Sequence, residues 1–471
     1  MRRNHGGARR LSIHGAACAV ALVLLAVSCS PPGNPPGTLT RPLDPVVMTG
    51  AQVSTLVGAP VGSIVAFHYD TAGWTQVPVQ VDQRKTVELN TIYHKAANTT
   101  NPVNVLVYAD PNTWAGAGSG VLGAQDEISF MSVDASGSAP SFSEPPNVVH
   151  NSGVKITVTD QRASNSLSFL YLYRQTGGLD PGAGKRYVDY QFKLTSGVYK
   201  TTYKMDVGPN PETSTVITPS YKRGFSDRWL DDGLSITAPG ASGADILDRH
   251  KALFAPGNCG RSEDTFDAAE GAFIANINGP VRAIRSYIGA NSGPYTERTQ
   301  IYYAQREDIT TNLRVHPIPS IMDFFDYSPA ASGMTYTNDR NLNGVPIDGV
   351  PDTVAAGAPI WEKVAGSQGT LTHVWQLSTD VNPAPAETNY YEDNATNPVK
   401  QCTGDAYSYG SSGTYVTGAI PNTDPNMGPA NQFTATHTLF FESPGQTNQS
   451  APKHADQVLN PAQVSTTAWT G

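Results

Sequence analysis

The sequence predicts an all-β protein: an N-terminal β-sandwich followed by a larger antiparallel β-sandwich domain. The composition includes 44 Gly, 36 Pro and 21 Tyr with only 15% charged residues, which favours strands and turns over long helices. Runs in which apolar and polar residues alternate recur along the chain, as in half-buried strands. At 471 residues the chain exceeds one ordinary core, so we expect two domains or one very large β-domain.

The N-terminus predicts export. Four arginines precede an apolar run over residues 16–27, which has the length of a secretory signal and is too short to span a bilayer. The segment Leu25-Ala26-Val27-Ser28-Cys29 resembles the lipobox of bacterial lipoproteins, and this resemblance implies that Cys29 is acylated after residues 1–28 are cleaved. The alternative is a simple cleaved signal peptide and a secreted protein. The proline-rich segment 29–45 stays extended and predicts a tether to the membrane of the bacterial cell surface.

The net charge indicates which classes of partner are disfavoured, and the cysteine content predicts a disulfide. Loss of the four signal arginines moves the formal charge from −9 to −13, and such an acidic surface disfavours nucleic acid, whose phosphates need clustered Lys and Arg. Cys18 leaves with the signal, so Cys259 and Cys402 remain beside Cys29. In an oxidising compartment this pair predicts one disulfide; two buried free thiols are the alternative.

The first domain is predicted over residues 46–140. Strands over 63–69 and 74–82 should pair as a hairpin, and Pro78 places the second strand at a sheet edge because it cannot donate to a ladder. Further strands are expected over 103–108 and 127–133, and the Ser-, Gly- and Pro-rich segment 136–153 predicts a domain boundary. The runs 74–82 and 126–135 together resemble exported bacterial proteins of unassigned function, which implies a β-sandwich but no activity.

The second domain is predicted over residues 151–450. Strands are expected over 154–160, 166–173 and 187–194, across much of 273–316, and over 373–377 and 437–442. Apolar residues at helical spacing predict a short helix over 244–254, and a serine cap predicts a helical turn over 319–327. Residues 451–471 are expected to form a loose, flexible tail.

The strand succession from 279 to 316 resembles the middle of galactose-mutarotase-like super-sandwich domains of carbohydrate-active enzymes. That resemblance implies a super-sandwich fold, although the family's catalytic His and Glu have no counterpart that we can place. Polysaccharide elimination needs a cation to neutralise a uronate and a Tyr or His to take a proton. Five strand residues have the required types, but each of them is equally explained by a local structural partner. These candidate catalytic residues are Arg282, Arg285, Tyr287, Arg314 and His316.

The stretch 337–352 predicts a structural calcium site. Asp339, Asn341 and Asn343 alternate, and Gly344 permits the turn that brings the Val345 carbonyl toward a hard cation. The run resembles the calcium loops of thrombospondin type 3 repeats, with Asp348 and Asp352 as trailing acids. The alternative is a pair of metal-free tight turns at 343–344 and 348–349. The predicted ligand set is Asp339, Asn341, Asn343, Val345, Asp348 and Asp352.

Two function classes remain open from the sequence. A calcium-stabilised surface protein that binds carbohydrate or acts as a scaffold needs only sandwich faces, tyrosines and a structural ion. A polysaccharide lyase or other carbohydrate-active enzyme needs a convergent site, and among 40 acids the sequence does not single out a catalytic pair. We therefore expect a membrane-anchored protein whose partner is polysaccharide, and leave catalysis undecided.

Overall fold

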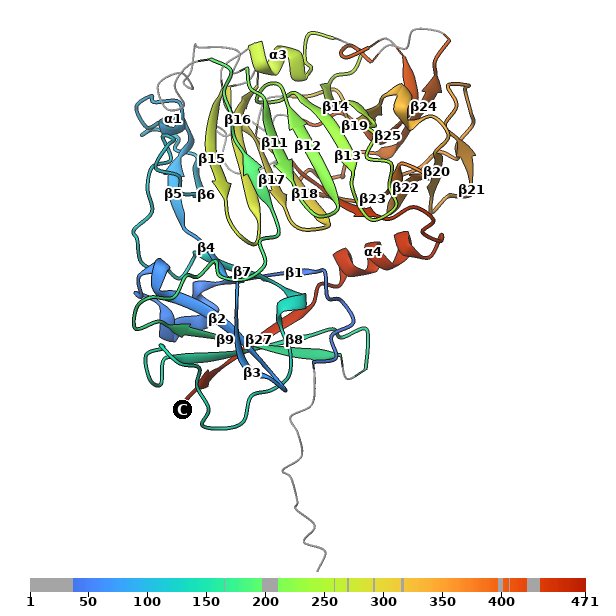
Figure 1. Cartoon of the computed structure of the whole chain (residues 1–471). Helices are drawn as coiled ribbons and strands as arrows, with labels where there is room; N and C mark the ends of the chain where they lie inside the picture. The colour runs from blue at the N-terminus through green and yellow to red at the C-terminus, as the bar shows by residue number, and fades with distance from the viewer. Residues whose placement is uncertain are drawn as a thin grey trace, which may run out of the picture.

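The computed structural model describes residues 37–164, 166–196, 211–257, 259–268, 271–290, 293–314, 317–396, 401–405, 407–421 and 433–471. The predicted all-β class is confirmed: antiparallel sheets dominate, and a smaller sandwich lies below a larger one in Figure 1. Among the described residues, no helix is both long and apolar enough to cross a membrane.

The smaller part is a two-layer sandwich. One layer has the strand order β1-β7-β4, the other β27-β8-β9-β2-β3, and apolar residues from both layers form a shared core. A separate hairpin, β5-β6, and helix α1 pack on the larger part. The strands are β1 (Pro45–Thr49), β2 (Ile64–Asp70), β3 (Gly73–Val77), β4 (Gln80–Asp82), β5 (Arg84–Glu88), β6 (Asn104–Tyr108), β7 (Glu127–Met131), β8 (Gly153–Thr159), β9 (Leu167–Arg174) and β27 (Gln463–Trp469), with α1 (Leu89–Ile92) and the 3-10 turns η1 (Gly50–Leu56), η2 (Val61–Ser63) and η3 (Ser132–Asp134).

Both ends of the chain build this smaller sandwich. Strands β8 and β9 follow the predicted boundary at 136–153, yet β9 pairs with β2 in one sheet. The expected loose tail is instead ordered: α4 (Ser450–Leu459) buries Ala451 and Ala455 against the larger part, and β27 pairs with β8 along its whole length. In Figure 1 this red segment returns to the blue and teal strands. Alternation in 463–469 and small residues on one face of α4 supply the physical reason.

The larger part packs two four-stranded sheets on one face of a nine-stranded sheet. The nine strands run β15-β16-β17-β18-β26-β23-β22-β20-β21, and the covering sheets run β10-β11-β12-β13 and β14-β19-β25-β24. Their bounds are β10 (Asp189–Gln191), β11 (Ser214–Ile217), β12 (Tyr221–Phe225), β13 (Asp231–Ile236), β14 (Leu247–Phe254), β15 (Ala272–Asn278), β16 (Ala283–Ala290), β17 (Gly293–Tyr302), β18 (Arg306–Leu313), β19 (Ile321–Tyr327), β20 (Thr335–Asn338), β21 (Asn341–Pro346), β22 (Trp361–Gly366), β23 (Gly369–Thr379), β24 (Glu387–Asn394), β25 (Ser408–Val416) and β26 (Phe433–Glu442), with α3 (Glu263–Ala268) and η4 (Pro329–Ala331).

One large core joins these three sheets. It includes Tyr221 and Phe225 from β12, Phe325 from β19, and Leu439 and Phe441 from β26. Helix α4 lies against the opposite face of the nine-stranded sheet, where Trp361, Val374 and Phe440 contact it. The interior between the sheets is therefore dry, and any charged side chain within it needs a partner supplied by the protein.

Two predicted helices are strands. Residues 247–254 form β14 and 321–327 form β19, which pair with each other. Every residue of β19 is buried, and β14 is buried on both faces over its second half, so neither strand shows the alternation that marks a half-buried strand. The predicted strand 74–82 divides at Pro78: β3 ends at Val77 as an edge strand, as expected, and β4 joins the other layer.

Candidate functional site

The two arginines predicted on the strand from 281 to 288 are both fully buried and paired with carboxylates. Arg282 donates from Nε to Asp82 (2.8 Å) and from Nη2 to Glu127 (2.6 Å), so it joins the larger part to the smaller sandwich. Arg285 makes a two-point contact with Glu212, at 2.6 and 3.0 Å. Both guanidinium groups are thus neutralised by the fold.

Of the other candidates, Tyr287 lies beside Arg285, whose guanidinium carbon is 5.5 Å from the centre of its ring, and Arg314 has a separate partner. Tyr287 is buried with its ring 5.0 Å from that of Trp229, edge to face. Arg314 donates to Glu297 at 2.9 Å. His316 lies outside the described residues. The structure therefore gives each described candidate a local partner within the protein.

A different set of polar residues converges between the sheets. We call it the histidine network, and it links the nine-stranded sheet to β14 and β19. Every member is less than 10% exposed. The contacts are Glu362 Oε1 to His373 Nδ1 (2.8 Å), His373 Nε2 to His437 Nδ1 (2.8 Å), His437 Nε2 to Asp323 Oδ2 (3.3 Å), His250 Nε2 to Asp323 Oδ1 (2.6 Å) and Arg298 Nη2 to Asp323 Oδ2 (3.1 Å).

Asp323 is the anionic centre of this network. Burial opposes its ionisation, but His437, Arg298 and His250 outweigh burial and hold the pKa of Asp323 well below its ordinary value. Burial lowers the pKa of His250 to about 3 against the opposing effect of Asp323, so this imidazole is neutral at pH 7. The network is a set of charges that the protein compensates internally.

The network has proton-relay geometry but no substrate access among the described residues. Three contacts join Glu362, His373, His437 and Asp323 in a row. His437 Nε2 lies 3.3 Å from Asp323 Oδ2 at the end of that row. A void of about 10 Å³ beside Glu362 and His373 has room for roughly one water molecule. Acid–base chemistry on a sugar would need a larger opening.

The sequence analysis missed this network because its histidines are scattered singly. Each stands at an inward strand position among apolar neighbours: His373 between Leu371 and Trp375, and His437 between Ala435 and Leu439. A lone polar residue at an inward position of an otherwise apolar strand face was the available signal. Which residues meet across the sandwich depends on non-local pairing.

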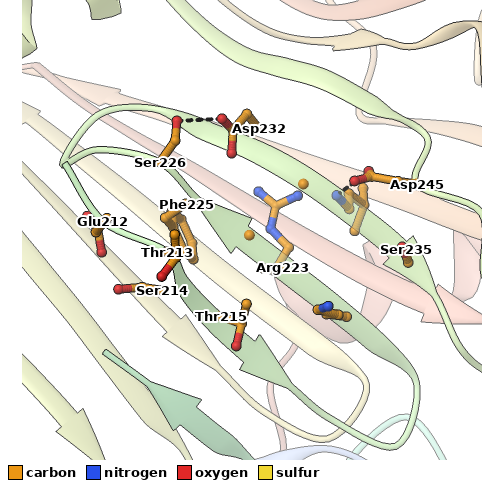
Figure 2. A pocket seen from close by; sticks show the side chains of 14 residues that line it. Glu212, Thr213, Ser214, Thr215, Arg223, Phe225, Ser226, Asp232, Ser235 and Asp245 are labelled. Atoms are coloured by element: carbon orange, nitrogen blue, oxygen red, sulfur yellow. Dashed lines mark hydrogen bonds between the residues drawn. The ribbon is translucent and has the colours of Figure 1, made fainter. Parts of the chain in front are cut away.

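An accessible site lies on the outside of the covering sheet β11-β12-β13. We call it the outer hollow; it has a volume of about 320 Å³, within the range of small-molecule pockets. Figure 2 shows its lining side chains spread over the three strands. The residues toward solvent are Thr213, Thr215, Lys222, Gly224, Ser226, Asp232, Gly233, Ser235 and Asp245, while Glu212, Ser214, Arg223, Phe225 and Leu234 line it from the buried side.

Two glycines form the floor of the outer hollow. Gly224 and Gly233 pair across β12 and β13, and a Cβ on Gly233 would lie 3.1 Å from the Cα of Gly224. Their missing side chains expose the backbone and create the depression between hydroxyl-bearing neighbours. A glycine inside a strand pattern indicates such a close approach, and this was the sequence signal for the site.

Two carboxylates stand beside that floor. Ser226 donates its hydroxyl hydrogen to Asp232, as the dashed line in Figure 2 shows. Asp245 Oδ1 accepts the backbone N–H groups of Leu234 (2.8 Å) and Leu247 (3.3 Å). Burial raises the pKa of Asp232; the Ser226 bond opposes this, and the nearby charge of Asp245 adds to it. The hollow thus offers partly desolvated acceptors next to hydroxyl groups.

The predicted calcium stretch forms a hairpin. The turn is Asp339-Arg340, between β20 and β21, so the expected turn at 343–344 is instead inside β21, where Gly344 has φ +72° and packs against Thr335 and Thr337. Asn341, Asn343 and Val345 alternate along β21. Asp339 Oδ2 accepts the N–H of Ile360 at 3.1 Å, and Oδ1 has no hydrogen bond. The acids Asp348 and Asp352 both raise the pKa of Asp393, after burial. Calcium binding stays a prediction.

The predicted disulfide is confirmed. Cys259 and Cys402 are bonded, with Cα atoms 5.2 Å apart, and link the loop after β14 to the segment before β25. The predicted signal segment 1–28, the acylated Cys29 and residues 30–36 of the predicted tether lie outside the described residues. The rest of the tether prediction is wrong, because residues 37–45 pack on the smaller sandwich: Arg41 is buried, and the Thr38 N–H donates to the Leu167 carbonyl at 2.8 Å.

Comparisons with known proteins return weak structural neighbours. The chain is similar to a protein of glycosyl hydrolase family 38 from Enterococcus faecalis (TM-score 0.39, 10% identity, 92% of this chain and 46% of that chain). It is also similar to an alpha-mannosidase from Enterococcus faecalis V583 (TM-score 0.35, 9% identity, 86% and 41%) and to a putative aldose 1-epimerase from Escherichia coli K12 (TM-score 0.25, 13% identity, 54% and 99%). The chain spans less than half the length of the first two.

The sequence matches no protein-family model and no curated protein. These neighbours are named as carbohydrate-related proteins. With TM-scores below 0.5, the likenesses assign neither a family nor an activity to this chain.

Proposed function

We propose that the protein is an exported surface protein, anchored through lipid on Cys29, that binds carbohydrate in the outer hollow. The observation that carries this proposal is the lining of the hollow: hydroxyl, carboxylate and backbone groups surround an open glycine floor. Sugars present many hydroxyl groups in a small volume, and such ligands are recognised by several fixed donors and acceptors. Export and anchoring rest on the signal-like N-terminus and the proline-rich tether.

We favour binding over catalysis because a ligand can reach the outer hollow but not the histidine network. Among the described residues, the histidines that converge are those of the histidine network, which is buried, whereas the accessible hollow holds two carboxylates but no histidine. The predicted catalytic residues that the structure describes are held in ion pairs or aromatic contacts, and three of them, Arg282, Arg285 and Tyr287, are fully buried. A polysaccharide lyase or another carbohydrate-active enzyme is therefore the less supported reading.

The test combines a glycan screen with two glycine variants. Gly224→Val places a side chain in the hollow, where the first carbon would meet its nearest neighbour at 3.4 Å, an ordinary contact. Gly62→Val is the matched control, because nothing lies within 4 Å of a Cβ at that position. Calorimetric titration should show at least tenfold weaker glycan binding for Gly224→Val and unchanged binding for Gly62→Val.

Either of two results would contradict the proposal: no glycan bound by the wild-type protein, or equal affinity for wild type and Gly224→Val. Anchoring is tested separately with Cys29→Ala, which should move the protein from the membrane fraction to the soluble fraction. If Cys29→Ala stays with the membrane, lipid on Cys29 is not the anchor.

A further inference from the structure

The outer hollow carries excess negative charge. Asp232 and Asp245 both line it, and Asp245 Oδ2 lies 3.6 Å from the Cβ position of Gly233, over the glycine floor. Asp245 contributes to the raised pKa of Asp232, so the two carboxylates are close enough to interact electrostatically. Lys222, on the neighbouring strand, is the one exposed cation in the lining. These charges set the class of ligand that the hollow prefers.

The remaining charged groups near the hollow are neutralised inside the protein. Glu212 is paired with Arg285, and Arg223 contacts both Asp231 and Glu307 beneath the sheet. Arg249 does not line the hollow but lowers the pKa of Asp232, an effect that outweighs the opposing one of Asp245, and its Nη1 pairs with Asp264 at 2.7 Å. Among the residues that the structure describes, two carboxylates and one lysine therefore face the hollow, on a protein whose formal charge is −9.

We propose that the hollow selects a cationic sugar, an amino sugar whose protonated amine sits over Gly224 and Gly233 between Asp232 and Asp245. This inference rests on the proposed function and names its ligand class. An ammonium group has three donors and no acceptor, so it matches two carboxylates whose other partners are a serine hydroxyl and backbone N–H groups. The hydroxyl groups of Thr213, Thr215 and Ser235 then meet the sugar hydroxyls.

The same charges work against other sugars. A uronate would bring a third carboxylate to two that already repel each other, so like charge disfavours it. A neutral sugar makes the hydrogen bonds but leaves the partly desolvated carboxylates without a cation. We expect the order amino sugar, neutral sugar, uronate in decreasing affinity.

Binding should be linked to pH through Asp232. Burial raises the pKa of Asp232 in the free protein, and a bound ammonium favours the ionised carboxylate, so binding releases a proton. The groups that act on this carboxyl are Ser226, Arg249 and Asp245, and Lys222 is the charged lysine in the lining of the same hollow. Affinity for an amino sugar should therefore fall as pH is lowered through the raised pKa of Asp232.

The experiment compares oligosaccharides that share one skeleton. Chitosan, chitin and cellulose oligomers of equal length differ at carbon 2, which bears an ammonium, an acetamide or a hydroxyl group. Titration calorimetry at low salt should show chitosan oligomers binding at least tenfold more tightly than cello-oligomers, with the preference shrinking as salt is added. Asp245→Asn and Asp232→Asn should lose the preference and keep cello-oligomer binding.

Controls separate specific from general charge effects. Asp380→Asn removes an exposed acid that does not line the hollow, and it should keep the full preference. Equal affinity for chitosan and cello-oligomers would overturn the inference and leave the proposed function standing. A preference retained in Asp245→Asn, or tighter binding of an oligouronate, would overturn the inference too. Absence of binding to every oligomer would overturn both.

Discussion

The outer hollow and the histidine network both contain aspartate side chains, but these aspartates have opposite roles in the two regions. Asp323 in the network meets His250, His437 and Arg298, all buried, and its charge is balanced by the protein. Asp232 in the hollow meets a single serine hydroxyl and stands beside another carboxylate. The two regions differ in how far protein groups balance the charge of the aspartate. A carboxylate that protein partners balance stabilises the fold, whereas a surface carboxylate with few partners is available to bind a ligand.

The backbone explains how the two regions arise from neighbouring strands. In β12 and β13, inward residues such as Arg223 and Asp231 join the buried ion pairs, while the outward Gly224 and Gly233 open the hollow. Side chains of successive strand residues point to opposite faces, so this sheet carries the hollow on one face and borders the histidine network on the other, where Asp231 lies 3.9 Å from His250. Substitutions on the two faces should therefore separate stability from binding.

The largest expected effect is the loss of stability when Asp323 of the histidine network is replaced. Asp323→Ala leaves three buried partners without their anion and should lower the free energy of unfolding by about 3–5 kcal/mol. The matched change on the open side, Asp232→Ala, should cost under about 1 kcal/mol. Urea unfolding of both variants at pH 7 measures the difference. Equal costs would show that the two carboxylates are not distinguished as we argue.

The second effect concerns the sheet that covers the histidine network. Replacing Cys259 and Cys402 together by serine removes a cross-link between residues 143 positions apart, beside β14 and β25, and should cost about 2–5 kcal/mol. Glycan binding in the hollow should be unchanged below the melting temperature, because β11, β12 and β13 lie in the other covering sheet. Mass spectrometry of the unreduced wild type should show the linked peptide. Two alkylatable thiols would refute the bond.

The third effect is a pH dependence of stability that arises from the buried side chain of Glu307. Burial raises the pKa of Glu307 to about 8, although Arg223 opposes this. The native state therefore keeps a proton that the unfolded chain loses above about pH 4.5, so this group's contribution to stability falls as pH rises toward 8. Glu307→Gln mimics the protonated carboxyl and should remove that loss, which is roughly 3–4 kcal/mol between pH 5 and 8.

The measurement is the difference in unfolding free energy between Glu307→Gln and wild type across that pH range. His250 has a pKa lowered to about 3, so its contribution to stability is lost as pH falls below about 6.5; this opposite slope is common to both proteins and cancels. Asp308→Asn is a useful companion, since Asp308 is the more exposed acid of the same strand and pairs with Arg306. A flat difference curve for Glu307→Gln would contradict the assignment.

Local patterns predicted much of the fold and little of the site. Strands such as β2, β6 and β7 were predictable because alternation and turns are local, and the bonded cysteine pair was predictable by count. Strands β14 and β19 were predicted as helices because burial on both faces removes the alternation that distinguishes strand from helix. The return of β27 to β8 spans most of the chain, and no local signal encodes such pairing.

The sites depend on the same non-local pairing. Arg285 had the right chemistry for catalysis, but its partner Glu212 lies 73 positions away, and only the sandwich brings them together. Asp323 and His437 likewise meet across two sheets. Gly224 and Gly233 carried a readable signal, because glycines in two successive strands indicate close approach, yet their register decides that they face each other.

The smallest expected effect belongs to the hairpin β20-β21, distant in sequence from the hollow. Asp339 has an unpaired Oδ1, and Asn341 and Asn343 follow it at alternate positions, so we predict weak binding of structural calcium, on the order of 10⁻⁴ M as in extracellular modules. At ten times that concentration calcium should stabilise the native state by about 1.4 kcal/mol, and chelator should remove the gain. Asp339→Ala should abolish the response, whereas Asp380→Asn should keep it.

Because the ion binds one edge of the nine-stranded sheet in this hypothesis, chelation should leave glycan affinity in the hollow unchanged. Identical melting curves with calcium and with chelator would show that the hairpin holds no ion, and a loss of glycan affinity on chelation would place the ion in the hollow instead.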